Sequence, residues 1–261
     1  MFERGRSGRR IAGWVAFYVL VVAASIVVLR AEQDLREEFH QTYPLAAGGR
    51  VSLHNVNGSV HIVAWDQNQV KVDAVKRART QEALKEAEIV VEARADAVEI
   101  RTKYPEHSGR HGDSASVDYT LSVPRQAKLD EIKTVNGAIE IAGTAAEVRA
   151  GSVNGGVTGR QLTGEVELST VNGRVEAELD RLAGKPISLK SVNGAVALRL
   201  PQDAGARLSA STVHGSIDSD FDLTVRHIAF GPGRDVETVI GKGGPDVKLR
   251  TVNGSIRLVR R

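Results

Sequence analysis

His54 and His61 are the first residues in the sequence whose types and spacing could bind a metal. They flank Asn57-Gly58, a dipeptide that favours a turn, so a hairpin at this point would place the two imidazoles opposite each other. Imidazole nitrogens are common zinc ligands, but a zinc site needs at least three protein ligands. Two ligands do not make a site, and we expect a solvated cross-strand pair here.

A second histidine pair, His107 and His111, has a spacing that one face of a helix would bring together, with Asp113 close by. Pro105 and Gly112 disfavour a helix in this stretch. We therefore predict a polar loop from residue 105 to 116 without a bound metal.

Three aspartates alternate at Asp218, Asp220 and Asp222, so they would share one face of a strand and could attract Ca²⁺. An EF-hand loop starting at Asp218 would need glycine at its sixth position and glutamate at its twelfth, and these positions hold Leu223 and Ala229. The sequence does not predict a calcium site.

Motifs for catalysis are missing from the sequence. It has no G-x-S-x-G nucleophile elbow, and the glycine-rich loop at 241–246 lacks the order of a phosphate-binding P-loop. Glu165 and Glu167 alternate on what should be a solvated strand face, which does not mark them as an acid–base pair. Between Thr120 and Asp220 there is no Phe, Tyr or Trp, the side chains that stack on sugars and bases. We expect no catalytic residues and no cofactor; a carbohydrate-active β-helix enzyme is the alternative.

The charge distribution argues against a nucleic-acid partner. The formal net charge is +3, but residues 1–31 hold five arginines and one glutamate, a net of +4, which leaves 30 basic and 31 acidic residues elsewhere. A nucleic-acid-binding domain carries its basic surplus on the folded part. The sequence has no cysteine, so disulfides cannot stabilise the fold.

The N-terminal segment predicts a membrane anchor. Residues 11–29 contain no charge, and nineteen helical residues span about 30 Å, the thickness of the hydrocarbon core. Four arginines precede this segment, so the positive-inside rule places residues 1–10 in the cytoplasm and the body outside the cell membrane. The alternative is a cleaved signal peptide, for which Ala23-Ala24-Ser25 and Ala31 offer small residues. Both interpretations export the body.

A tetrapeptide close to T-V-N-G recurs seven times along the body. Its glycines between residues 137 and 215 are spaced by 18, 18, 21 and 21 residues, and the next spacing is 39, with a degenerate copy at 238–241. Fixed periods near 20 indicate stacked repeats. Asn-Gly is a strong turn signal because both residues tolerate positive φ. The predicted turn residues are Asn57, Gly58, Asn136, Gly137, Asn154, Gly155, Asn172, Gly173, Asn193, Gly194, His214, Gly215, Asn253 and Gly254.

Two architectures fit the repeat. In a β-solenoid, each tetrapeptide forms a corner between two short amphipathic strands, and equivalent asparagines can form a hydrogen-bonded ladder along the stack. In a meander of Asn-Gly hairpins packed as a sandwich, Glu167 would face Glu178 and Arg250 would face Arg257, which is unfavourable. We favour the solenoid. His214 replaces asparagine and Ile240-Gly241 breaks the pattern, so we expect an interrupted ladder there. We also expect the last repeat to form the end of the stack, where it needs a cap or a partner.

The sequence resembles the bacterial putative-adhesin domain family, a domain of unknown function with TVNG repeats. The resemblance rests on GGRVSLHNVNGSVHIVAWD at 48–66, KTVNGAIEI, LSTVNGRV, LRLPQDAGARLSASTVHGSIDSDF and LRTVNGSIRL, and it covers about residues 39–261. It implies a β-helix-like fold and a cell-envelope location, often with a membrane anchor. It implies no catalytic residues. We therefore expect a non-enzymatic protein that presents a rigid β-repeat domain for adhesion, scaffolding or envelope-stress sensing.

The expected organisation follows the chain. A linker at 30–48 should follow the transmembrane helix, then an N-terminal β region at 49–125 and the repeats at 126–261, with 49–261 forming one continuous domain. Within the β region we expect strands at 51–64, 70–77, 89–93, 97–102 and 117–123. A short helix near 80–88 is predicted by Thr80 as its N-cap.

Overall fold

The computed structural model describes residues 34–105, 114–222, 226–227 and 233–261. The described residues belong to one compact unit. The predicted arm at 1–10 and the predicted transmembrane helix at 11–29 lie outside the described residues. Within the described ranges, no helix has the length and apolar content needed to cross a membrane.

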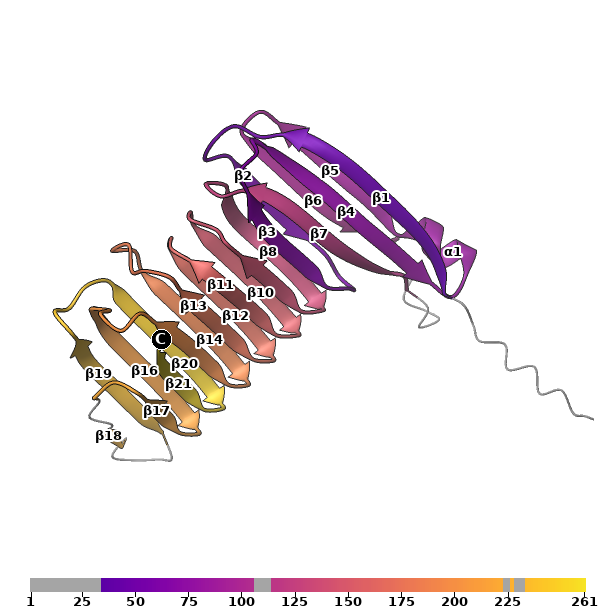
Figure 1. Cartoon of the computed structure of the whole chain (residues 1–261). Helices are drawn as coiled ribbons and strands as arrows, with labels where there is room; N and C mark the ends of the chain where they lie inside the picture. Colours follow the sequence, from indigo (N-terminus) through magenta and orange to yellow (C-terminus); the bar gives the residue numbers. More distant parts are fainter. Residues whose placement is uncertain (1–33, 106–113, 223–225, 228–232) are drawn as a thin grey trace, which may run out of the picture. The chain divides into compact units, whose positions relative to one another are not determined.

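The described fold is all-β, as the sequence predicts, and its strands form two sheets (Figure 1). The ten-stranded sheet has the order β1 (Leu35–Pro44), β4 (Gln69–Ala78), β7 (Ser116–Pro124), β3 (Val60–Trp65), β9 (Ile139–Ala142), β11 (Val157–Leu162), β13 (Val175–Leu179), β15 (Val196–Leu200), β21 (Ile256–Arg260) and β17 (Ile217–Ser219). The eleven-stranded sheet has the order β18 (Arg226–His227), β19 (Arg234–Ile240), β16 (Ala206–His214), β20 (Asp246–Asn253), β14 (Ile187–Asn193), β12 (Val166–Asn172), β10 (Val148–Asn154), β8 (Lys128–Asn136), β2 (Arg50–His54), β6 (Ala97–Lys103) and β5 (Glu88–Arg94).

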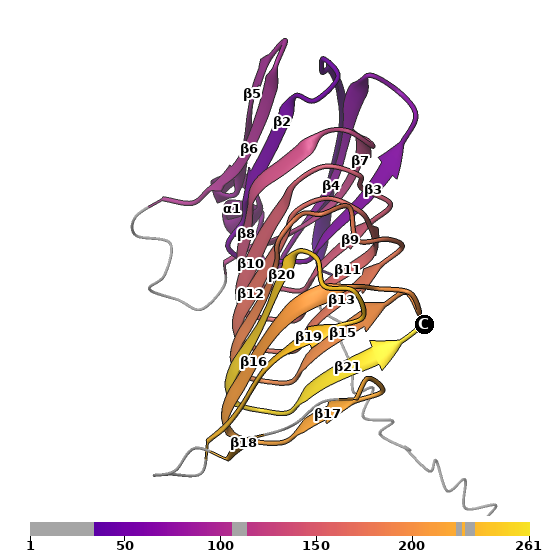
Figure 2. The ribbon, with the colours of Figure 1, turned by 90° about the vertical axis from the view of Figure 1, so that its left-hand side faces the viewer.

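Each tetrapeptide connects one strand of the eleven-stranded sheet to one strand of the ten-stranded sheet, and we call this two-strand unit a rung. Neighbouring rungs pair in parallel and in register; for example, Leu168 of β12 pairs with Leu189 of β14, and Ala177 of β13 pairs with Leu198 of β15. These four side chains are buried between the sheets. The aliphatic core therefore continues from rung to rung, and Figure 2 shows the rungs nested one behind another.

The hairpin alternative is wrong for the repeats. The strands before and after a tetrapeptide lie in different sheets and pair with the neighbouring rungs instead of with each other. Glu167 and Glu178 consequently do not face each other as they would in a hairpin. The arrangement is solenoid-like.

The spatial order of the rungs differs from their order in the sequence. The last repeat, β20 and β21, inserts between the rung of β14 and β15 and the rung of β16 and β17, and its yellow strands lie among orange ones in Figure 1. Our expectation that the last repeat forms the end of the stack is therefore wrong. The degenerate copy at 238–241 is not a corner either, because Thr238–Ile240 belongs to β19, which pairs antiparallel with β16.

The N-terminal part corrects two further expectations. Most of the predicted linker at 30–48 is β1, which pairs antiparallel with β4 along its whole length and packs Phe39 and Tyr43 against the core. The expected single strand at 51–64 is two strands, β2 and β3, on either side of the first corner.

The short helix is present as α1 (Gln81–Glu86), and the Thr80 hydroxyl accepts a hydrogen bond from the backbone N–H of Ala83. Lys76 is almost fully buried beside this helix. It donates to the backbone oxygens of Leu84 and Ala87 and forms an ion pair with Glu37 of β1 at 2.8 Å. These contacts connect the helix to the first strand.

Candidate functional site

The first position of the tetrapeptide holds a buried hydroxyl that connects neighbouring rungs. In each of six rungs, the Thr or Ser hydroxyl donates to the glycine carbonyl of the adjacent rung at 2.8–3.2 Å. The donors are Thr134, Ser152, Thr170, Ser191, Thr251 and Thr212. A buried hydroxyl without a partner is costly, so this contact favours the in-register stack over a shifted one.

The third position forms a ladder of asparagine side chains along the stack. Each Nδ2 donates to Oδ1 of the preceding asparagine at 2.8–2.9 Å, through Asn57, Asn136, Asn154, Asn172, Asn193 and Asn253. The expected interruption at His214 does not occur. Because Asn253 inserts beside Asn193, His214 lies after Asn253 at the end of the ladder.

The fourth position is glycine for a reason that differs from our expectation. Among the repeat glycines, only Gly58 has a positive φ. A Cβ on Gly137, Gly155, Gly173, Gly194, Gly254 or Gly215 would lie 1.8–2.3 Å from the glycine carbonyl oxygen of a neighbouring rung. Any side chain here would force two backbones apart. At these six positions glycine is therefore required by the close approach of the rungs and not by a left-handed turn.

The second position is a valine whose side chain remains exposed. The seven valines are each between 37% and 41% exposed, and the residues on either side of them are register partners, so valines of neighbouring rungs lie side by side. Together they form a row of partly exposed apolar side chains along the stack. We call this surface the valine stripe; it consists of Val56, Val135, Val153, Val171, Val192, Val252 and Val213.

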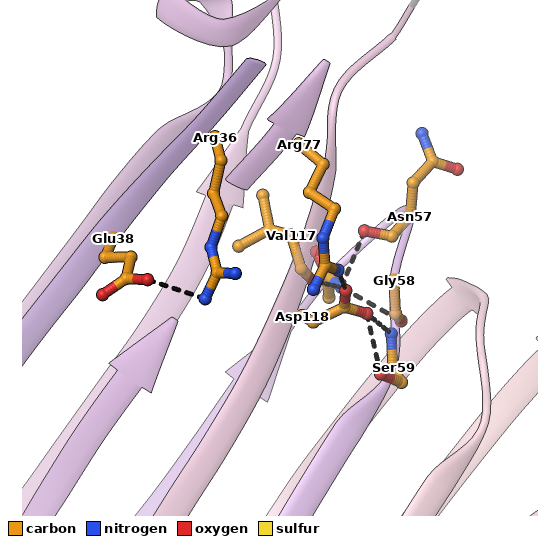
Figure 3. A network of polar contacts seen from close by, with 9 residues as sticks. Arg36, Glu38, Asn57, Gly58, Ser59, Arg77, Val117 and Asp118 are labelled. Atoms are coloured by element: carbon orange, nitrogen blue, oxygen red, sulfur yellow. Dashed lines mark hydrogen bonds and ion pairs between the residues drawn. The ribbon is translucent and has the colours of Figure 1, made fainter. Parts of the chain in front are cut away.

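The first corner is completed by side chains from outside the repeat (Figure 3). The backbone N–H of Val117 in β7 donates to the Asn57 carbonyl at 2.8 Å, so β7 takes the place of a further rung. Asn55 occupies the hydroxyl position, and its Nδ2 donates to the Val117 carbonyl at 2.9 Å. The sequence signal for this different corner is an asparagine where every other repeat has Thr or Ser.

Asp118 of β7 closes the same corner. Its carboxylate accepts hydrogen bonds from the backbone N–H and the hydroxyl of Ser59, at 2.8 and 2.7 Å, and forms an ion pair with Arg77. Burial alone would raise the pKa of Asp118, but the contacts with Ser59 and Arg77 outweigh burial and lower this pKa. The charged carboxylate is therefore part of the folded structure at neutral pH.

His54 and His61 do not come together in the described structure. His54 lies in β2 beside Glu131, and His61 lies in β3 of the other sheet beside Glu140, each at 3.5 Å. The expected cross-strand pair is therefore wrong. His107 and His111 lie outside the described residues. In the described ranges, no three His, Asp or Glu side chains converge as metal ligands would.

Four of the other candidate carboxylates have partners within the protein. Asp218 accepts a hydrogen bond from the Ser216 hydroxyl, and Asp220 accepts one from the backbone N–H of Arg260. Glu165 and Glu167 both lie within 4 Å of Arg149 on the outer face of the eleven-stranded sheet. These contacts give the carboxylates structural roles on a solvated face.

Comparison with known protein families shows that residues 110–259 match the family described as Toastrack DUF4097. No protein of curated function matches the chain.

Three solved structures are similar, each 11% identical to the chain. A "putative cell adhesion protein" from Clostridium sporogenes aligns over 87% of this chain and 100% of its own, with a TM-score of 0.47. A "putative adhesin" from Bacteroides fragilis aligns over 86% and 97%, with a TM-score of 0.42. A "putative lipid binding protein" from Parabacteroides distasonis aligns over 87% and 96%, with a TM-score of 0.30.

Proposed function

Since the chain belongs to the Toastrack DUF4097 family, we propose that it is a non-enzymatic cell-envelope protein that presents its stacked corners outside the membrane for adhesion. Residues 11–29 serve as the single-pass anchor, with residues 1–10 in the cytoplasm. This placement is supported by the nineteen consecutive residues without a charge and by the four arginines that precede them.

The observation that carries the proposal is the valine stripe. Single exposed valines are normal on a protein surface, but seven at equivalent positions of neighbouring rungs form a regular apolar array. In the Asn ladder beside it, each interior side chain donates one hydrogen bond to one neighbour and accepts one from the other, so the ladder presents an ordered border. Repeat proteins use such continuous surfaces to bind extended partners.

Binding of isolated envelopes of the producing cells to the full-length protein, reconstituted in lipid vesicles so that its anchor is already inserted, tests this function. The variant carries Val153→Thr, Val171→Thr and Val192→Thr, which keep the shape of the side chains and replace one exposed methyl group of each with a hydroxyl. We expect envelope binding to fall at least tenfold, because three side chains at the centre of the stripe become polar.

The matched control carries Val63→Thr and Val239→Thr, which change exposed valines outside the stripe. It should bind like the wild type. Equal binding by all three proteins, with unchanged thermal unfolding, would contradict the proposal.

A further inference from the structure

Three basic side chains meet on the outer face of the eleven-stranded sheet. Register places Lys190 of β14 beside Arg250 of β20, and Ser188 beside Lys248. On the other side of β20, Ser209 and Ser211 of β16 are the partners of Lys248 and Arg250. This cluster exists only because the last repeat inserts between β14 and β16, so the order of the sequence does not reveal it.

The surface is hollowed at this cluster. A hollow of about 320 Å³ is lined by Ser188, Lys190, Lys248 and Arg250, among others. The serine side chain is short and lies between the longer basic ones, which leaves room above the sheet. The volume is large enough for an anionic group together with part of the molecule that carries it.

The charges around the hollow are unevenly neutralised. Of the carboxylates that line it, Glu167 contacts Lys190 at 3.0 Å, and Asp246 contacts Arg207 at 2.8 Å. The third, Glu165, lies 3.6 Å from Arg149. Lys248 and Arg250 form no ion pair with any residue in the described ranges. Two adjacent cations therefore remain available to a ligand.

A neighbouring hollow on the same sheet face provides a comparison. It measures about 310 Å³ and also contains basic residues, including Lys133 and Arg149. Here Lys133 pairs with Glu131 at 2.7 Å, and Arg149 lies near four carboxylates. The two hollows have similar size, but only the first has cations without partners.

The geometry points to a binding site for a phosphate group in the hollow formed by Ser188, Lys190, Lys248 and Arg250. A guanidinium presents a planar fork of donors to phosphate oxygens, and an ammonium adds a compact charge. Serine hydroxyls can donate to the same oxygens. The phosphate can belong to a soluble phosphorylated molecule or to a lipid headgroup, and the site lies on the sheet face and does not depend on the valine stripe.

The test uses the full-length protein reconstituted in vesicles of neutral phosphatidylcholine, with the body facing outward. Inorganic phosphate and glycerol phosphate are titrated in one arm, followed by calorimetry. In the other arm, separate vesicles containing phosphatidylglycerol are added, and tethering between vesicles is followed by light scattering. Binding in the first arm alone indicates a soluble ligand, and tethering indicates a headgroup; either result supports the site.

The variant Lys248→Gln/Arg250→Gln should show at least tenfold weaker phosphate binding or vesicle tethering, in whichever arm the wild type responds. The control Lys128→Gln/Lys133→Gln removes the same charge from β8 on the same face and should change binding less than twofold. Equal loss in both variants would show unspecific attraction by the sheet face and would overturn the proposal. A wild-type protein that responds in neither arm would overturn it as well.

Discussion

The first corner of the stack and the corners inside it share one backbone path but are stabilised by different partners. An interior corner such as Thr170–Gly173 contacts an equivalent corner on each side, through a hydroxyl, an Asn side chain and a glycine carbonyl. The first corner has such a neighbour on one side only, and β7 occupies the other side with Val117 and Asp118.

The difference shows what the tetrapeptide specifies. Interior corners are nearly identical in sequence because each one is the template for the next. At the first corner, the partner is β7, which pairs in parallel with β3 but belongs to no corner of its own, so Asn55 replaces the hydroxyl residue and a charged network replaces the next rung. The repeat thus encodes the contact between rungs more than it encodes a turn.

Replacing Gly155 with alanine should cause the largest effect, because its Cβ would lie 2.0 Å from the Gly137 carbonyl oxygen. We expect a loss of about 3–5 kcal/mol in the free energy of unfolding, measured by urea denaturation. The adjacent Gly156 has more space, with the nearest atom at 3.3 Å, and the equivalent positions hold Ala138 and Ala195.

Gly156→Ala is therefore the matched control and should change the free energy of unfolding by less than about 1 kcal/mol. If the two variants were equally destabilised, backbone flexibility would explain the glycine better than the close approach of the rungs.

At the first corner, Asp118→Asn should cost about 1–3 kcal/mol at neutral pH, because it weakens charge-assisted hydrogen bonds. The folded-state pKa of Asp118 is lowered, so its contribution is present above the ordinary carboxyl pKa of about 4 and is lost as the pH falls below it. The difference between wild type and variant, measured by urea denaturation across pH 3–7, should therefore shrink towards acid pH.

The exposed ion pair of Asp66 with Arg125 supplies a control. Asp66→Asn should change stability by about 1 kcal/mol or less at any pH. A pH-independent loss in Asp118→Asn would mean that shape, and not charge, closes the first corner.

Much of the fold follows from the sequence because the alternation of apolar and polar residues fixes which side chains face the core. Leu168, Leu189 and Leu198 are buried as their period of two predicts. The spatial order of the rungs does not follow, because the five rungs with corners at Gly137, Gly155, Gly173, Gly194 and Gly254 all present the same hydroxyl, asparagine and glycine. Any of these five rungs is therefore compatible with any other as a neighbour, and the position of the last repeat depends on the connections between rungs.

Strand β1 and the contacts of Asp118 are also not predicted by the sequence, because neither belongs to the repeat. The strand β1 contacts the core through few side chains, mainly Phe39 and Tyr43, and its exposed polar residues resemble a linker. Asp118 lies 59 residues from its partner Ser59, and no local pattern announces that contact.

The smallest effect should come from the asparagine ladder, where the interior and the end can be compared directly. Asn172 donates to Asn154 and accepts from Asn193, so Asn172→Ala removes two exposed hydrogen bonds and should cost about 1 kcal/mol in urea denaturation. His214 ends the ladder, and its ring makes no hydrogen bond to a residue in the described ranges, so His214→Ala should change stability by less than about 0.5 kcal/mol.

A double-mutant cycle of Asn154→Ala with Asn172→Ala separates the ladder from the loss of side-chain packing. If the ladder stabilises the stack, the two changes are coupled, because the second removes a hydrogen bond that the first has already broken. Strict additivity would show that the side chains act independently and that the buried hydroxyls and close glycines alone hold the rungs in register.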